Sequence, residues 1–501
     1  MKRFVEEHPR RFFLLCVAAF AVISYGLFGF FRGGDDTYIY LQFVKHFIHG
    51  EGLCFNSGER TYGFTSIVWI LILSAARLAT GNALAASMAA SFFWSVALLF
   101  VWWMFAQKVT RDLTVVALGT VLFVVDPNLL KHSYLGMETP LSGFLILLAV
   151  ALYSREREDG RNLPLSGLVF SLAILNRPES GLVVILVVCD QLIHKLPAAF
   201  IARFILLCTA PVIAWGSFAF LYFGTFVPNT VLAKGGSYAP FGRFIANLKD
   251  STSILLPPYA AVFFSLVAFA AGMRHRSKEE QRSWWRDHWL MYAIPGALVL
   301  SYCALVNNEL VYARYMFLFI PLLLYETFAL LTSPVPVFSQ RMRRILLAAI
   351  AVEFVAIDIA TALATRLSYL PAEQAKSENI RWIREHTDPR AIVVTGVLGR
   401  YGYETDRKLI CPIGLLNPDI ISYIKTGRTL DYYRSRHADY FVILSKSPDD
   451  PGDLLRATNA RIVHSDPMPS IFLVRQLLNP STPRETYWLN VIQVDWGDAQ
   501  R

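Results

Sequence analysis

The chain has 501 residues, of which 54% are hydrophobic and only 17% are charged, whereas about 25% of the residues in an ordinary soluble domain are charged. This composition excludes a disordered chain, a nucleic-acid-binding domain and a soluble enzyme with one large core, and it indicates a protein embedded in a lipid bilayer. The formal net charge of +9 does not require a polyanionic partner, because basic residues collect in the cytoplasmic loops of membrane proteins.

The N-terminal segment predicts a retained membrane anchor. Lys2, Arg3, Arg10 and Arg11 precede an uncharged run from Phe12 to Phe31, and a run of about 20 residues is long enough to cross a bilayer. The run is too long for the hydrophobic part of a signal peptide, and it lacks a convincing small-residue cleavage site. We therefore expect the N-terminus to lie in the cytoplasm.

Further apolar runs predict a polytopic helical membrane protein with about eleven spans in all. They cover residues 83–105, 113–127, 139–153, 163–176, 180–194, 201–222, 254–272, 288–306, 311–331 and 344–363. With the N-terminus inside, every clearly basic short loop falls on the cytoplasmic side. This orientation requires that the apolar run from Ile67 to Ala79 lies along the interface. The alternative, a short span, would invert every later loop.

After Leu363 the sequence becomes polar and predicts a C-terminal α/β domain on the outer face. The boundary is placed between a membrane module, residues 1–368 with a first outer loop at 32–82, and an extracytoplasmic domain, residues 369–501. The patterns within that domain predict a helix over Glu373 to His386 and strands over Ala391 to Thr395, Tyr440 to Ser445 and Ile471 to Arg475.

Two adjacent carboxylates follow the first span. Gly33 and Gly34 end that span, and Asp35 and Asp36 begin the amphipathic stretch that continues to His49. Acidic residues in the first turn of a helix interact favourably with the helix dipole, which is one explanation of the pair. The other is a catalytic pair, in which one Asp accepts a proton from a sugar hydroxyl and its neighbour lies near a developing positive charge or a cation.

Other polar residues of the outer loops are predicted to face the same space. They are Glu138 in SYLGMET, Arg177 and Glu179 in NRPE, Asn229 and Lys234 in YFGTFVPNTVLAKGG, and Arg314 in YARY. Cations in this space suit a bound lipid phosphate, which arginine grips through two N–H groups. Plainer roles also fit: a helix cap for Glu138, an Arg177–Glu179 pair, headgroup contact for Arg314 and solvation for Lys234.

The sequence defines no metal site. The six cysteines have no CxxC spacing and imply neither a disulfide framework nor a zinc site. His46 and His49 lie three residues apart, but two histidines alone do not make a metal site. No cofactor is predicted, and the question of a divalent cation stays open. Glu353 and Asp358 lie within the last predicted span, where ionisable groups are costly, and neither has a predicted partner.

The order of these motifs resembles a known family. The chain is similar to the polyprenyl-phosphate-sugar-dependent membrane glycosyltransferases of the GT-C fold. The features that carry this resemblance are, in order, a basic N-terminus, one span, the stretch GGDDTYIYLQFVKHFIHGEGLCFNSGERTYGFTS, the motifs LGMET, NRPE, FGTFVPNT and ARY, and a polar outer domain. Within that group the chain most resembles the terminal arabinofuranosyltransferases of actinobacterial cell walls and the pilin arabinosyltransferases. The resemblance covers nearly the whole chain, and Asp35 to Ser66 is its most specific part.

The resemblance implies transfer of a sugar, suggested to be arabinofuranose, from a polyprenyl-phosphate donor to a cell-envelope glycan or surface protein. The reaction would take place at the outer face of the bacterial inner membrane. The catalytic acid maps onto Asp35 or Asp36. The residues implied for the donor are Arg177, Lys234 and Arg314 at the phosphate, and Tyr38 and Tyr62 at the sugar.

The C-terminal domain departs from the family pattern. Between Val394 and Asp419 the family often has acidic residues where this chain has Val397 and Cys411 or Pro412, so acceptor binding or a structural cover is expected of the domain. Two other functions are kept as alternatives. A secondary transporter or flippase of lipid-linked sugars would have polar or broken helices at mid-membrane. A non-catalytic envelope scaffold would give no reason for acidic and basic residues to converge.

Overall fold

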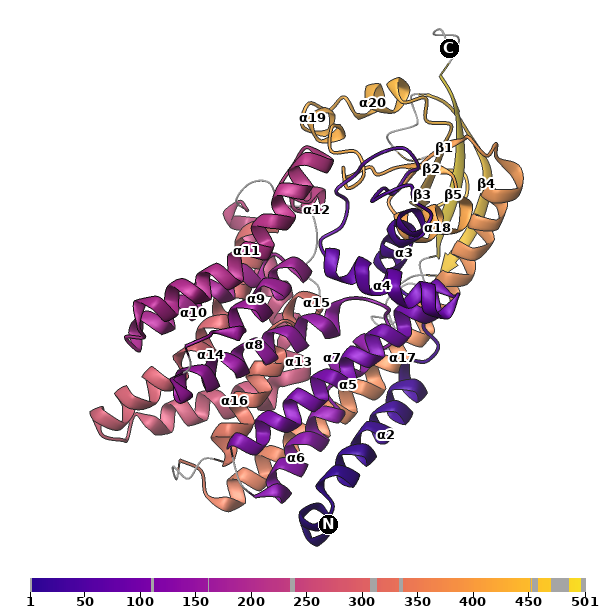
Figure 1. Ribbon diagram of the computed structural model, residues 1–501. Coiled ribbons are helices and arrows are strands. Elements are labelled where there is room, and N and C mark those ends of the chain that lie inside the picture. Colours follow the sequence, from indigo (N-terminus) through magenta and orange to yellow (C-terminus); the bar gives the residue numbers. More distant parts are fainter. Residues whose placement is uncertain are drawn as a thin grey trace.

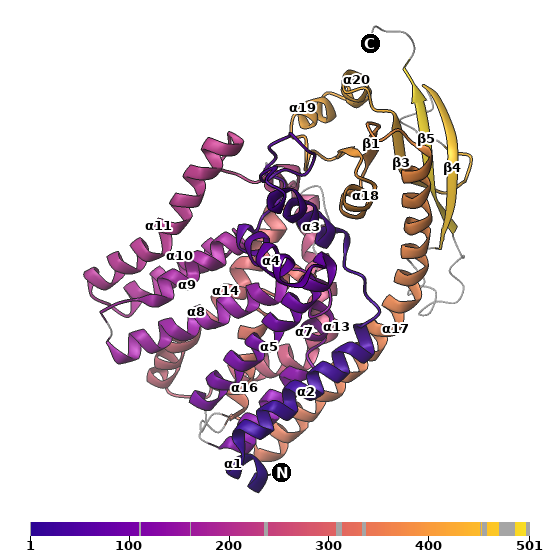
Figure 2. The same cartoon turned by 45° about the vertical axis from the view of Figure 1, so that its right-hand side comes forward.

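The computed structural model describes residues 2–109, 112–160, 162–234, 239–306, 313–332, 337–450, 452, 458–469 and 486–496. A large helical bundle occupies most of its volume, and a single sheet lies at one end of the bundle (Figure 1). The first helix, α1 (Lys2–Glu7), lies at the opposite end of the bundle from that sheet, as the turned view also shows (Figure 2).

Each apolar run that predicted a span overlaps a helix of the bundle. These helices are α2 (Pro9–Phe28), α5 (Ala83–Val109), α6 (Leu113–Val124), α8 (Thr139–Asp159), α9 (Leu165–Asn176), α10 (Ser180–Ile193), α11 (Ala198–Phe223), α13 (Phe241–Met273), α14 (Lys278–Leu305), α16 (Ile320–Thr332) and α17 (Gln340–His386). Within the described ranges, 6 helices are long and apolar enough to cross a membrane, namely α2, α5, α11, α13, α14 and α17. The others are shorter or more polar, so the count of about eleven spans stays a prediction.

Shorter helices connect the bundle to its sheet-bearing end. They are α3 (Asp35–Ile48), α4 (Ile67–Thr80), α7 (Pro127–His132), α12 (Asn229–Lys234) and α15 (Ala313–Met316). The run predicted as an interfacial helix forms α4, whose first turn is capped by the Ser66 hydroxyl, which accepts a hydrogen bond from Trp69 N at 2.9 Å. At 14 residues, α4 is shorter than the roughly 20 residues that a spanning helix needs.

The C-terminal domain contains a sheet of mixed direction. Its described strands are β1 (Ile392–Thr395), β2 (Lys408–Ile410), β3 (Tyr440–Ser445), β4 (Asn459–Pro469) and β5 (Thr486–Asp495), in the order β2-β1-β3-β5-β4. Strand β1 pairs in parallel with β2 and β3, whereas β5 is antiparallel to β3 and β4. The helices α18 (Leu398–Thr405), α19 (Ile420–Lys425) and α20 (Thr429–Ser435) connect β1, β2 and β3.

Two of the predicted strands are present as β1 and β3. The third, over Ile471 to Arg475, lies outside the described residues. The parallel part of the sheet buries valine and isoleucine side chains of β1 and β2, among them Val393, Val394 and Ile410. Strands buried on both faces are expected to read as such continuous apolar runs.

Helix α17 joins the bundle to the sheet. It has 47 residues, and it runs beside α2 in the bundle and beside the sheet at its other end (Figures 1 and 2). Buried Asn379 anchors the second half, because its side-chain amide donates hydrogen bonds to Asp466 Oδ2 at 3.0 Å and to Leu489 O at 3.2 Å. The predicted last span and the predicted helix over Glu373 to His386 are therefore one helix, and the proposed boundary at residues 368/369 falls inside it.

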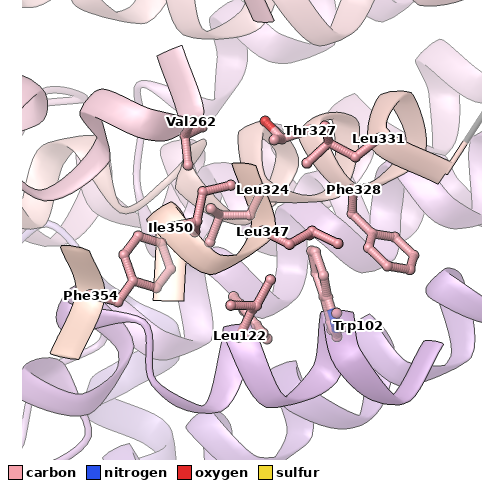
Figure 3. Close-up of a pocket in the computed structure, with 12 residues that line it drawn as sticks. Trp102, Leu122, Val262, Leu324, Thr327, Phe328, Leu331, Leu347, Ile350 and Phe354 are labelled. Atoms are coloured by element: carbon pink, nitrogen blue, oxygen red, sulfur yellow. The ribbon is translucent and has the colours of Figure 1, made fainter. Parts of the chain in front are cut away.

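A small cavity lies inside the bundle, between α5, α6, α13, α16 and α17 (Figure 3). Its volume is about 20 Å³, which is room for about one water molecule. Its lining is apolar apart from Thr327, whose hydroxyl donates to Leu323 O at 2.8 Å. This cavity offers no group for chemistry.

Candidate active site

A much larger cavity, of about 700 Å³, lies between the helical bundle and the C-terminal domain. Its lining includes Asp35, Asp36, Glu138, Arg177 and Arg314. These residues come from α3, from the segments before α8 and α10, and from α15, so helices far apart in the sequence bring them together. Glu179 lines the same cavity.

Asp36 forms an ion pair with Arg314 across the cavity wall. Neither aspartate caps α3: the Thr37 hydroxyl accepts a hydrogen bond from Gly34 N at 3.2 Å and closes the first turn. The Arg314 guanidinium also lies 5.4 Å from the centre of the Tyr315 ring, where the face of an aromatic ring attracts a cation. Asp36 thus holds a cation at the surface of the cavity.

Asp35 is held by the C-terminal domain. Its carboxylate accepts a hydrogen bond from Arg400 N, in the first turn of α18, at 3.2 Å. Burial and the neighbouring Asp36 carboxylate raise the pKa of Asp35 to about 6, although the backbone N–H groups of Gly399 and Arg400 oppose this shift. The close approach requires a glycine, because a Cβ at Gly399 would lie 1.8 Å from Asp35 O.

Arg177 lies between two glutamates. Its Nη2 is 3.6 Å from Glu138 Oε1, and its Nη1 is 3.5 Å from Glu179 Oε1. Both glutamates precede a helix, but neither side chain makes a capping hydrogen bond, so a cap does not account for Glu138. Within the described part of the chain, Arg177 Nη1, Glu138 Oε2 and Thr230 Oγ1 are buried without a hydrogen-bond partner. Buried polar atoms of this kind call for a ligand, water or ion.

Asn176 fixes the position of Arg177. Its side-chain oxygen accepts a hydrogen bond from Ser66 Oγ at 2.7 Å, and its side-chain nitrogen donates to Ser142 Oγ at 2.8 Å. The two bonds tie the end of α9 to the start of α4 and to α8. The NRPE motif therefore contains one residue that builds the site, Asn176, and three that line it.

The structure places both predicted sugar-binding tyrosines away from the cavity lining. The Tyr38 hydroxyl donates to Arg32 O at 2.8 Å. The Tyr62 hydroxyl accepts from Trp215 Nε1 at 2.8 Å, and its ring stacks on Phe223 with a centroid distance of 4.9 Å. The tyrosines that line the cavity are Tyr40, Tyr302 and Tyr315. YARY contains the last of these, but no sequence pattern distinguished Tyr40 from Tyr38.

The first turn of α12 supplies Thr230 and Val231 to the lining, whereas Asn229 fastens the start of this helix to its neighbours. The backbone N–H of Asn229 donates to Tyr62 O at 2.8 Å, and its side chain donates to Leu415 O at 3.3 Å. The side chain of Lys234 lies outside the described part of the structure, so its predicted role stays a prediction.

The C-terminal domain covers the cavity. It contributes Gly396, Leu398, Ile413 and Leu415, so its described share of the lining carries no charged side chain. Val397 precedes α18, and Cys411 is buried. Asp35 receives its hydrogen bond from this domain through the backbone alone.

Comparison with known proteins shows which fold the chain has. A family model described as a domain of unknown function matches residues 365–489. The chain is similar to two crystal structures of ArnT from Cupriavidus metallidurans. The first structure, bound to undecaprenyl phosphate, is 12% identical in sequence, and the match covers 97% of this chain and 98% of that chain with a TM-score of 0.59. The second, in the apo state, is also 12% identical, and the match covers 95% of this chain and 97% of that chain with a TM-score of 0.61. The chain has a GT-C fold. A search of curated proteins finds no match.

The fold prediction is thereby confirmed as a polytopic helical membrane protein of the GT-C type with a C-terminal α/β domain. At 12% identity the similarity establishes the fold alone, since one fold hosts many activities.

Proposed function

We propose that the protein is a membrane glycosyltransferase that moves a sugar from a polyprenyl-phosphate donor to a hydroxyl group of a cell-envelope glycan or surface protein. The observation that carries the proposal is the convergence of two aspartates and two arginines in one large cavity, Asp35, Asp36, Arg177 and Arg314. The undecaprenyl phosphate bound to ArnT supports a polyprenyl phosphate as the lipid. A scaffold would give no reason for this convergence.

The two arginines suit the donor phosphate. A sugar phosphodiester carries about one negative charge and gains more as the sugar leaves, so fixed cations stabilise the transition state more than the ground state. Within the described structure Arg177 Nη1 has no hydrogen-bond partner, although it lies 3.5 Å from Glu179 Oε1, and Arg314 is held at the cavity surface by Asp36. A phosphate oxygen would satisfy Arg177 Nη1 and would offset the cost of burying it.

Asp35 is the better candidate for the base, and Asp36 for a positioning role. A carboxyl with a pKa of about 6 is ionised at neutral pH and is a stronger base than an ordinary aspartate. In the step we propose, Asp35 takes the proton of the acceptor hydroxyl, and the acceptor oxygen bonds to the anomeric carbon. The bond from that carbon to the phosphate oxygen breaks, and its electron pair stays with the phosphate.

The proposal has three further parts. The transferred sugar is arabinofuranose, the reaction takes place at the outer face of the bacterial inner membrane, and the N-terminus lies in the cytoplasm. These follow from the family resemblance and from the distribution of basic residues between loops. The cavity itself distinguishes neither pentose from hexose nor inversion from retention, so the sugar is assigned by experiment. A panel of polyprenyl-phosphate pentoses and hexoses, offered one at a time with membrane extract as acceptor, measures which donor is consumed.

The test of the proposal is transfer of labelled sugar by the purified protein. We expect wild type to release polyprenyl phosphate and to label an acceptor in the extract, and we expect Asp35→Asn and Asp36→Asn to lose most of this activity. Asp431→Asn is the matched control, because Asp431 lies on α20 in an exposed pair with Arg428. Full transfer by both active-site variants would refute the assignment. Transport of intact donor across proteoliposomes without transfer would establish the flippase alternative instead.

A further inference from the structure

Three metal-ligating side chains meet where α3 ends, outside the cavity lining. His46 belongs to α3, and Glu51 and Cys54 belong to the loop that follows it. Their ligand atoms all lie within 4.8 Å of one another, and His46 Nε2 is 4.0 Å from Glu51 Oε2. His46 and Cys54 are buried, whereas Glu51 is exposed. The cluster is thus closed on the protein side and open to solvent at the glutamate.

Two glycines fold the loop back over the last turn of α3. Gly50 and Gly52 have φ angles of 81° and 88°, a conformation that other residues rarely adopt. Glu51 N donates to His46 O at 3.0 Å, which places Glu51 beside the histidine. The tight reversal brings Cys54 to the same side, and the sequence spacing of the three residues did not indicate this meeting.

The histidine ring is oriented for coordination. Its Nδ1 lies 3.0 Å from Cys54 O, and a carbonyl oxygen only accepts hydrogen bonds, so Nδ1 carries the proton. The lone pair is therefore on Nε2, on the side of Glu51. A histidine that ligates a metal through one nitrogen commonly donates its other N–H to a backbone carbonyl in this way.

A fourth polar group completes the surroundings. Gln42, one turn before His46, is 4% exposed, and its Nε2 lies 3.5 Å from His46 Nε2. Among the described residues its Oε1 is buried without a hydrogen-bond partner. Gln42 Nε2 also donates to Phe55 O at 3.2 Å, which fixes the orientation of the amide, so Gln42 packs beside the histidine and leaves the fourth position to water.

We propose that His46, Glu51 and Cys54 bind a zinc ion, with water in the fourth position. Imidazole, thiolate and carboxylate are the ligands that zinc takes in proteins, in tetrahedral geometry with bonds of about 2.0–2.3 Å. Such bonds place the ligand atoms about 3.4–3.8 Å apart, so binding draws the three side chains together by up to about 1 Å, mainly through exposed Glu51. The Cys54 thiol gives its proton to solvent as the zinc–sulfur bond forms.

The zinc would clamp the loop that joins the two parts of the molecule. Asn56, two residues after Cys54, exchanges hydrogen bonds with the backbone of Leu409 in β2, at 2.9 Å and 3.0 Å. Farther along, Gly63, Phe64 and Thr65 line the large cavity. A metal at His46 therefore stabilises the contact between the loop and the C-terminal domain, whether or not the protein transfers sugars.

Zinc content and thermal stability test this proposal. The full-length protein is purified in detergent, stripped with a chelator and given zinc chloride, and the bound metal is measured by mass spectrometry after desalting. We expect about one tightly bound zinc ion per chain and a rise of the thermal midpoint by several degrees. His46→Asn, whose amide can keep the hydrogen bond to Cys54 O, and Cys54→Ser should lose both effects.

The matched controls are His49→Asn, an exposed histidine three residues along, and Cys189→Ser, an exposed cysteine. Both should bind zinc as wild type does. A wild-type chain that binds no zinc, or His46→Asn and Cys54→Ser variants that bind as much as wild type, would overturn the proposal. If either variant fails to fold, the cobalt-loaded wild type decides, because a cobalt–thiolate absorption band supports Cys54 as ligand and its absence excludes it.

Discussion

Asp35 and Asp36 are neighbours, yet the same substitution at each should change stability in opposite directions. Burial and the Asp36 charge raise the pKa of Asp35 from 3.8 to about 6. Between these two pH values the native state binds a proton that the unfolded state does not, so the stability contribution of this group falls as the pH rises through that window. Above it, the native protein bears the full cost of an ionised Asp35.

The structure gives the size of the effect. A shift of about 2 pKa units corresponds to at most about 3 kcal/mol, and solvent screening of the half-buried side chain reduces this to about 1–2 kcal/mol. Asn at position 35 is neutral, and its side-chain oxygen can still accept the hydrogen bond from Arg400 N. We therefore expect Asp35→Asn to be inactive but more stable than wild type by about 1–2 kcal/mol at pH 7, and to lose this advantage below about pH 4.

Asp36→Asn removes the carboxylate that pairs with Arg314. Losing a charge-assisted contact of a partly buried arginine should cost about 1–3 kcal/mol, and transfer should fall as well. The test is to measure the thermal midpoints of the two variants and of wild type in one detergent at pH 7 and at pH 5. These midpoints show whether each substitution raises or lowers the stability of the protein. Equal destabilisation by both substitutions at pH 7 would refute the reasoning, because it would show that ionised Asp35 bears no cost in the native state.

Further predictions concern the groups that hold the cavity together. Gly399→Ala should force α18 away from Asp35 and lower both transfer and the thermal midpoint, whereas Gly242→Ala, where a Cβ meets nothing within 4 Å, should change neither. Arg177→Met should cost about 3–5 kcal/mol, because it leaves Glu138 buried without its cation; a thermal midpoint equal to that of wild type would contradict the pairing. Transfer by wild type should decline as the pH falls through about 6, where Asp35 gains a proton, and a rate independent of pH between 5 and 8 would exclude Asp35 as the base.

The sequence predicted those features of the molecule that short, continuous stretches of residues encode. Hydropathy located the bundle helices, and β-rich runs bounded by turn residues located β1 and β3. The interfacial position of α4 stays a prediction, because α6, α9, α10 and α16 are no longer than α4. Local signals also predicted that Asp35, Asp36 and Arg177 share one face, because the distribution of basic residues between loops predicts the same side of the membrane for each.

Contacts across large sequence separations were not predictable from one sequence. The hydrogen bond from Arg400 to Asp35 joins residues 365 positions apart, and nothing near Gly399 indicates that its backbone must approach α3. Tyr38 and Tyr40 differ by two positions, and which of them faces the cavity depends on the rotation of α3 against α18. The polar residues after Leu363 predicted the end of a helix, but packing against the sheet continues α17 through them.

The continuity of α17 has a geometric consequence for the architecture of the protein. A helix advances 1.5 Å and turns about 100° with each residue, so the number of residues between the bundle and Asn379 sets the height and the rotation of the sheet above the cavity. Inserting a single alanine near residue 366 would swing α18 around that axis and carry Gly399 off Asp35. The length of α17 between the bundle and Asn379 therefore sets the alignment of the two parts of the molecule.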